Sequence, residues 1–177
     1  MPIWGSRPQA LLRQSDSERV TLYERAIACL ARREYSRAEL ARKLAGHAEE
    51  SEGADVVDTG EAIAAVLDRL EAQNLLSDTR YAEMLGHSRA GRHGSLRLRQ
   101  DLKQKGVSEQ DCAIPLAEAQ ASDLEHCRSV WQKKFAVLPV DLKDRARQTR
   151  FLLSRGFPGR VVAQVLKGAV DEDFAGI

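Results

Sequence analysis

The fold is decided by the stretch LKQKGVS at residues 102–108, which returns without a gap as LLSRGFP at residues 152–158. A repeat at this period is typical of one small helical unit used several times along a chain. Gly106 and Gly156 are each expected to end a helix in the left-handed conformation, which only glycine adopts at low cost. The apolar residue after each glycine should then pack back on the leucine four residues before that glycine.

Working outward from this turn, three leucines place three helices in register: Leu67, Leu116 and Leu166. We therefore predict an all-α fold of three tandem three-helix repeats that form an elongated, curved array. The expected limits are a flexible tail at 1–14, repeats at 15–73, 74–120 and 121–170, and an acidic tail at 171–177. The first repeat has Leu44 at the position aligned with the glycine turn and carries an acidic insertion at about 48–58. Its turn should therefore be built differently.

Ser and Thr positions followed three residues later by a carboxylate predict helix starts at Ser15, Ser36 and Ser108. The expected helices run over about 15–33, from Ser36, and over 60–73, 77–90, 95–105, 108–119, 121–135, 141–155 and 158–168. Pro115 conflicts with the sixth of these, because a proline inside a helix removes a hydrogen bond and costs about 3 kcal/mol. We expect a kink or an early end there.

Composition excludes several classes of protein. The formal net charge is +1, so the chain as a whole lacks the excess positive charge that would favour binding to DNA or membranes. Only 5% of residues are aromatic. The three cysteines and four histidines lack the spacing of metal ligands or of a disulfide framework. No apolar run is long enough to span a bilayer, and the first residues lack the core of a signal peptide. We expect a cytoplasmic protein with reduced, buried cysteines.

Catalytic patterns are missing from the sequence. It has no phosphate-cradling glycine loop, no GxSxG and no HExxH. We therefore expect no enzymatic activity and no cofactor or metal.

Basic residues gather around the second helix of each repeat. Residues 89–105 hold six bases against Asp101, residues 143–160 hold six against Asp144, and the first repeat has a weaker cluster. One such cluster alone would be an ordinary solvated face, but recurrence on equivalent helices predicts a continuous basic stripe. The candidate contact residues are Arg92, Arg97, Arg99, Lys103, Lys105, Arg147, Arg150 and Arg155.

A helix-turn-helix that reads bases in the major groove is disfavoured. Its recognition helix would be the third helix, which in the second repeat carries Glu109, Asp111 and Glu118 and no base. These carboxylates would repel phosphate, so contact with a DNA backbone through the second helices is the more reasonable alternative.

Four separated segments resemble one known family. They read AxLARREYSxxEL at 28–40, NLLSDTRYA at 74–82, GxxRLxxDLxxKGV at 94–107 and RFLxxRGF at 150–157. In this order they resemble the RecX family of regulatory proteins, over about residues 20–168. The resemblance implies three tandem three-helix repeats and a non-enzymatic protein that binds the RecA nucleoprotein filament. It also implies inhibition of the filament's ATPase, strand-exchange and co-protease activities, which tunes recombination and the SOS response.

Three functional hypotheses follow from these observations. The first is a monomeric RecX-type modulator of the RecA filament. The second is a low-specificity protein that binds the single- or double-stranded DNA backbone directly. The third is a helical scaffold whose acidic segment, residues 49–61, docks a basic protein.

Overall fold

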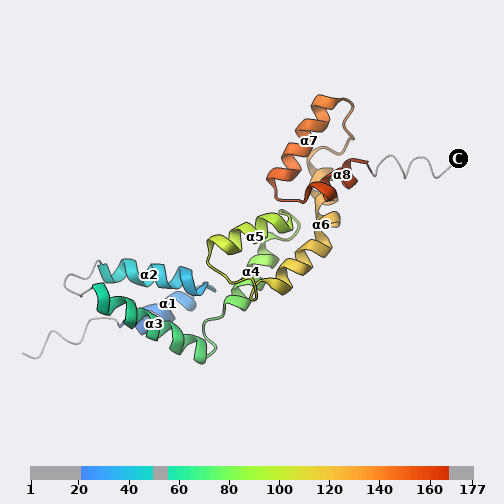
Figure 1. Cartoon of the computed structure of the whole chain (residues 1–177). Coiled ribbons are helices and arrows are strands. Elements are labelled where there is room, and N and C mark those ends of the chain that lie inside the picture. The colour runs from blue at the N-terminus through green and yellow to red at the C-terminus, as the bar shows by residue number, and fades with distance from the viewer. Residues whose placement is uncertain (1–20, 50–55, 168–177) are drawn as a thin grey trace, which may run out of the picture.

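The computed structural model describes residues 21–49 and 56–167, and these residues form eight helices and no strand. The helices make an elongated array rather than one compact layer (Figure 1). The expected tails lie outside the described residues, as do positions 50–55 of the acidic insertion. The predicted all-α repeat architecture is confirmed.

The first repeat contains α1 (Leu22–Leu30), α2 (Arg37–Glu49) and α3 (Val56–Ala72). Thr21 caps α1 through a complete capping box with Glu24, so this helix begins at Leu22 and is shorter than the predicted 15–33, while the start predicted at Ser15 lies outside the described residues. Leu40 and Leu44 of α2 are fully buried, as their spacing predicts. They pack with residues of α1 and α3, and with Leu76 after the end of α3, in a buried cluster separate from that of the second repeat.

The second repeat begins with α4 (Asp78–Arg89) and α5 (Ser95–Gln104). Ser77 caps α4, while Leu98 and Leu102 point into a separate buried cluster that includes Tyr81. These features agree with the sequence.

One long helix, α6 (Ala113–Lys134), replaces the two helices predicted at 108–119 and 121–135. Ser108 does form the expected cap with Asp111, but residues 108–112 are a turn and the helix starts after it. Pro115 therefore lies in the first turn, where its missing N–H would have no intrahelical partner. The predicted kink is wrong for that reason, and the limit expected at residue 120 falls inside a continuous helix.

The third repeat is completed by α7 (Leu142–Ser154) and α8 (Gly159–Lys167). Trp131 and Phe135, at the end of α6, pack into its core, and Phe135 meets Phe151 edge to face with ring centroids 5.3 Å apart. Because α6 contributes to the cores of both the second and the third repeat, those two repeats share a rigid element. The first repeat has no such shared helix.

Candidate functional site

The second helices of the three repeats lie end to end. At the end of α5, the Gly106 N–H donates to Lys103 O (3.1 Å) and the Val107 N–H to Leu102 O (3.2 Å). The same two bonds recur after α7, where Gly156 donates to Leu153 O (2.9 Å) and Phe157 to Leu152 O (3.4 Å). This pattern is the left-handed glycine cap expected from the sequence repeat, and Gly106 and Gly156 have φ of 75° and 84°.

Each glycine turn docks on the first turn of the second helix in the preceding repeat. The Ser36 hydroxyl, at the start of α2, donates to Lys105 O at 2.6 Å. At the start of α5, Gly94 N–H donates to Arg155 O (3.0 Å) and Leu96 N–H donates to Gly156 O (3.1 Å). Backbone carbonyls that lack an intrahelical partner at the end of one helix thus accept hydrogen bonds from groups at the start of the next, and the helix dipoles run head to tail. We call α7, α5 and α2 in this order the second-helix column (Figure 1).

Glycine is also required in these turns because the neighbouring repeat lies very close to them. A Cβ on Gly156 would lie 2.5 Å from the Arg97 backbone nitrogen, and a Cβ on Gly106 would lie 2.7 Å from the Ala38 Cβ. Both distances are too short for any real side chain. The sequence predicted the turn, but only the tertiary structure shows that the turn is also the contact between repeats.

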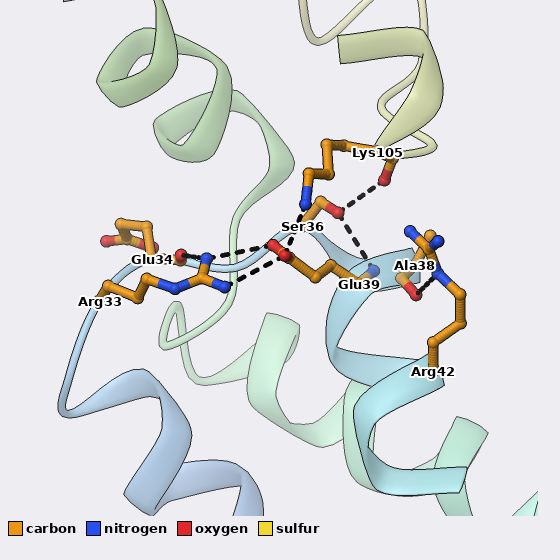
Figure 2. Close-up of polar contacts among 7 residues, drawn as sticks. All are labelled: Arg33, Glu34, Ser36, Ala38, Glu39, Arg42 and Lys105. Carbon is orange, nitrogen blue, oxygen red and sulfur yellow. Dashed lines mark hydrogen bonds and ion pairs between the residues drawn. The ribbon is translucent and has the colours of Figure 1, made fainter. Parts of the chain in front are cut away.

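The junction between the first and second repeats is held by charges (Figure 2). Lys105 Nζ lies 2.7 Å from Glu39 Oε1, and Arg33 pairs with the same carboxylate at 3.1 Å. Burial opposes ionisation of Glu39, but the hydrogen bonds from Arg33 and Lys105 together outweigh it and lower the pKa of this carboxyl. Glu39 is therefore ionised at neutral pH and links two repeats.

Further polar contacts cross the same junction. The Arg80 side chain pairs through Nε with Glu34 Oε1 at 3.0 Å, and the backbone N–H of Arg37 donates to Asp78 Oδ1 at 2.7 Å. Because the buried clusters of the first two repeats are separate, these contacts rather than an apolar core fix the angle of the first repeat.

The junction between the second and third repeats has a different charge balance. Asp101, which is buried, accepts ion pairs from Arg97 (3.0 Å) and from Arg89 (3.0 Å). His93 lies beside them, and burial together with the nearby arginines lowers its pKa. The imidazole is therefore neutral at pH 7, while the arginines keep this junction positive.

The eight candidate contact residues fall into three sets. Three are engaged within the chain: Arg97 with Asp101, Lys105 with Glu39, and Arg147 with Asp144 at 2.6 Å. Arg155 is half-buried and its guanidinium lies 5.1 Å from the centre of the Phe151 ring. The others are exposed and have no ion pair within the part of the chain that the structure describes: Arg92, Arg99, Lys103 and Arg150.

Sequence reasoning missed the residues that join the repeats. Ser36 and Glu39 were recognised as a helix cap, and the structure keeps the hydrogen bond from Glu39 N to Ser36 Oγ at 3.2 Å. Their second role, toward Lys105, spans more than sixty positions of sequence (105 against 39) and leaves no local signal. The buried Asp123, which accepts from the Ser95 N–H at 2.9 Å, is hidden for the same reason.

No group of His, Cys, Asp or Glu side chains within residues 21–49 and 56–167 is arranged to hold a metal ion. None of the helices in these ranges is both long enough and apolar enough to cross a membrane. Cys29, Cys112 and Cys127 are buried free thiols, as expected.

Comparison with known proteins identifies the family. Residues 77–113 match the second three-helix domain of RecX and residues 121–166 match the third. A regulatory protein RecX from Ralstonia pickettii is 41% identical over 150 residues, which cover 85% of this chain and 89% of that protein. The chain belongs to the RecX family. Another RecX regulatory protein, from Leptothrix cholodnii, is 44% identical over 158 residues, covering 89% and 95% of the two chains.

Solved RecX structures share the fold. A crystal structure of regulatory protein RecX superposes with a TM-score of 0.64 at 22% identity, covering 81% of this chain and 70% of the other. RecX from Lactobacillus salivarius gives the same TM-score at 16% identity, with 83% and 93% covered. At these identities the likeness supports the architecture alone.

Proposed function

We propose that this RecX-family chain binds the RecA nucleoprotein filament and inhibits its ATPase, strand-exchange and co-protease activities. Through this inhibition it would tune recombination and the SOS response in the cytoplasm. Membership of a family of regulatory proteins is the observation that carries the proposal. The chain acts by stoichiometric binding as a monomer, without chemistry of its own.

The second-helix column supplies a surface suited to this role. Its exposed cations without an internal ion pair are Arg99 and Lys103 on α5 and Arg150 on α7, and Arg92 precedes α5 in the turn after α4, so they are spread along the array. A filament is a repeating lattice of protein and phosphate, and an elongated basic surface complements such a target over several of its units. We assign the contact to Arg92, Arg99, Lys103 and Arg150. Arg97, Lys105 and Arg147 act mainly inside the chain, and Arg155 forms part of the docking turn.

Inhibition of RecA ATPase on single-stranded DNA tests the proposal. Arg99 and Lys103 are exposed and one turn apart on α5, so changing both to Glu reverses the surface charge without removing a pair seen in the structure. We expect the double variant to need at least about tenfold more protein for half-inhibition, since several charge contacts are lost together. The matched control is Arg128→Glu with Lys167→Glu, two exposed bases on α6 and α8.

The wild-type chain tests the proposed function, and the two variants test the assignment of the surface. If the wild-type chain, added at an equimolar ratio to RecA, leaves the ATPase rate unchanged, the proposed function is contradicted. Equal inhibition by the column variant and the control variant contradicts the assignment of the surface.

Direct binding to the DNA backbone is the second candidate, and the same exposed cations favour it. Affinity for single-stranded DNA without RecA should then fall steeply with salt, and each lost phosphate contact should flatten the log–log slope by about 0.7. Absence of binding at low salt removes this candidate. Within residues 21–49 and 56–167 no aromatic side chain is fully exposed for base stacking, since Tyr35, Tyr81, Trp131 and Phe157 are buried and Tyr23, Phe135 and Phe151 are half-buried.

A further inference from the structure

The loop between α6 and α7, together with the first residue of α7, presents three aliphatic side chains to solvent. Val137 is 66% exposed, and Val140 and Leu142 are each 86% exposed. We call these three residues the apolar tip. The segment that holds them runs from the end of α6 to the start of α7, at the end of the array away from the first repeat (Figure 1). The two 86% values are the highest among the large hydrophobic residues that the structure describes.

The apolar tip belongs to a loop that is fixed from inside. Phe135 and Leu138, which alternate with tip residues along the chain, pack against the core of the third repeat. The buried Gln148 donates from Nε2 to Val137 O at 3.2 Å and accepts from the Trp131 indole N–H at 2.7 Å. The loop is therefore held in one conformation, yet its aliphatic side chains face outward.

The second end of the loop is equally well anchored. Asp141 caps α7 by accepting the Asp144 N–H at 2.6 Å, which fixes where Leu142 begins the helix. An exposed aliphatic group held in a preset position loses little conformational entropy when a partner covers it. Scattered exposed aliphatic residues need no explanation, but three within six positions of a stretch that is anchored at both ends mark an interaction surface.

Charge indicates the chemistry of the partner. Exposed bases flank the tip on both sides, Lys133 and Lys134 at the end of α6 and Lys143 and Arg145 at the start of α7. They outnumber the two carboxylates of this stretch, Asp141 in the helix cap and Asp144 paired with Arg147. None of the four has an ion pair among residues 21–49 and 56–167. An apolar pocket with an acidic rim complements this arrangement. A nucleic acid offers acid but no aliphatic pocket, and aliphatic side chains do not stack on bases as aromatic ones do.

We propose that the apolar tip is an anchor that inserts into an acid-rimmed apolar pocket on the protein partner, a RecA protomer within the filament. The inference rests on the proposed function and adds a protein contact to the electrostatic one. The column supplies long-range attraction, while the tip supplies the buried apolar contact that slows dissociation.

The double variant Val140→Ser, Leu142→Ser tests the anchor. Its matched control is Ile114→Ser with Leu75→Ser, which removes two other exposed aliphatic residues, 64% and 43% exposed. Both variants alter only surface side chains, so both should keep the wild-type thermal unfolding midpoint. We expect the tip variant to require roughly tenfold more protein for half-inhibition of RecA ATPase, the size expected when an interface anchor is truncated. The control should inhibit at the wild-type concentration.

Three outcomes would overturn the inference. If wild-type and tip variant inhibit at equal concentration, the anchor is wrong and the proposed function stands. If the wild-type chain does not inhibit at all, the proposed function falls and the inference falls with it. If the wild-type chain sediments with vesicles of phosphatidylglycerol, the tip variant does not, and both inhibit RecA equally, the tip binds a lipid surface instead.

Discussion

The two repeated glycines differ from an ordinary glycine turn in a way that stability measurements can resolve. Gly91 and Gly156 both have left-handed backbones, with φ of 69° and 84°. A Cβ added to Gly91 would meet nothing within 4 Å, whereas one added to Gly156 would strike the backbone of Arg97. The substitution Gly91→Ala therefore measures backbone strain alone, and Gly156→Ala measures strain plus the inter-repeat contact.

The magnitudes follow from the contacts. Backbone strain at a left-handed alanine costs about 1–2 kcal/mol, which is the whole expected effect of Gly91→Ala. In Gly156→Ala the turn must also move away from α5, which breaks the two hydrogen bonds to Arg155 O and Gly156 O. Each is worth roughly 1 kcal/mol net, so the total is about 3–4 kcal/mol. Gly106→Ala should fall between the two, because its clash is with the Ala38 methyl group rather than with backbone.

Urea denaturation followed by circular dichroism gives the free energies of unfolding for the three variants. The expected order of destabilisation is Gly156→Ala, then Gly106→Ala, then Gly91→Ala. If Gly156→Ala costs no more than Gly91→Ala, the close contact between the third repeat and α5 does not exist in solution, and the second-helix column is wrong.

Three further predictions concern buried polar groups. The pKa of Glu39 is lowered in the folded chain, so its ion pair with Lys105 stabilises the fold above the ordinary pKa of 4.5, and this stabilisation is lost as pH falls through the lower folded value. The unfolding free energies of wild type and Glu39→Gln should therefore converge between pH 7 and pH 3. A difference that stays constant over this range would contradict the pairing. Burial, with a smaller contribution from a neighbouring carboxylate, raises the pKa of Cys127 to about 12. Peptide mapping after iodoacetamide at pH 8 should find this thiol unmodified in native protein and alkylated in urea; rapid native labelling would show that the core opens. Replacing Gln148 with Leu leaves the Trp131 indole N–H without its acceptor and should lower the free energy of unfolding by about 1–3 kcal/mol; an unchanged urea midpoint would mean that the indole bond contributes nothing.

Local patterns predicted individual helices well and their junctions poorly. The boundaries of α4, α5 and α7 follow from serine caps, aspartate caps and glycine stops that act within one turn of the chain. Pro115 was misjudged because its meaning depends on where the helix begins. A turn that keeps residues 108–112 out of the helix changes proline from a breaker into a tolerated first-turn residue.

The sequence showed where basic residues gather, but not which of them remain available to a partner. Much of each basic cluster in the second and third repeats falls on α5 or α7, but Arg89 lies on α4 and Arg160 on α8, and the continuous basic stripe stays a prediction. Which of these cations remain available depends on carboxylates far away in sequence, such as Glu39 for Lys105. A carboxylate's distance from a base in space cannot be read from composition, so the division into structural and exposed cations required the structure.

A helical repeat built around one glycine turn can be recognised from the sequence, because cap chemistry and apolar spacing act between residues a few positions apart. The folded structure was needed to see that Gly106 and Gly156 join neighbouring repeats, that their close approach excludes any Cβ, and that three aliphatic residues between α6 and α7 remain uncovered. The difference lies in the range of the interactions. Helix formation is local, whereas the contacts that align the column connect residues 60 or more positions apart, such as Gly156 and Leu96.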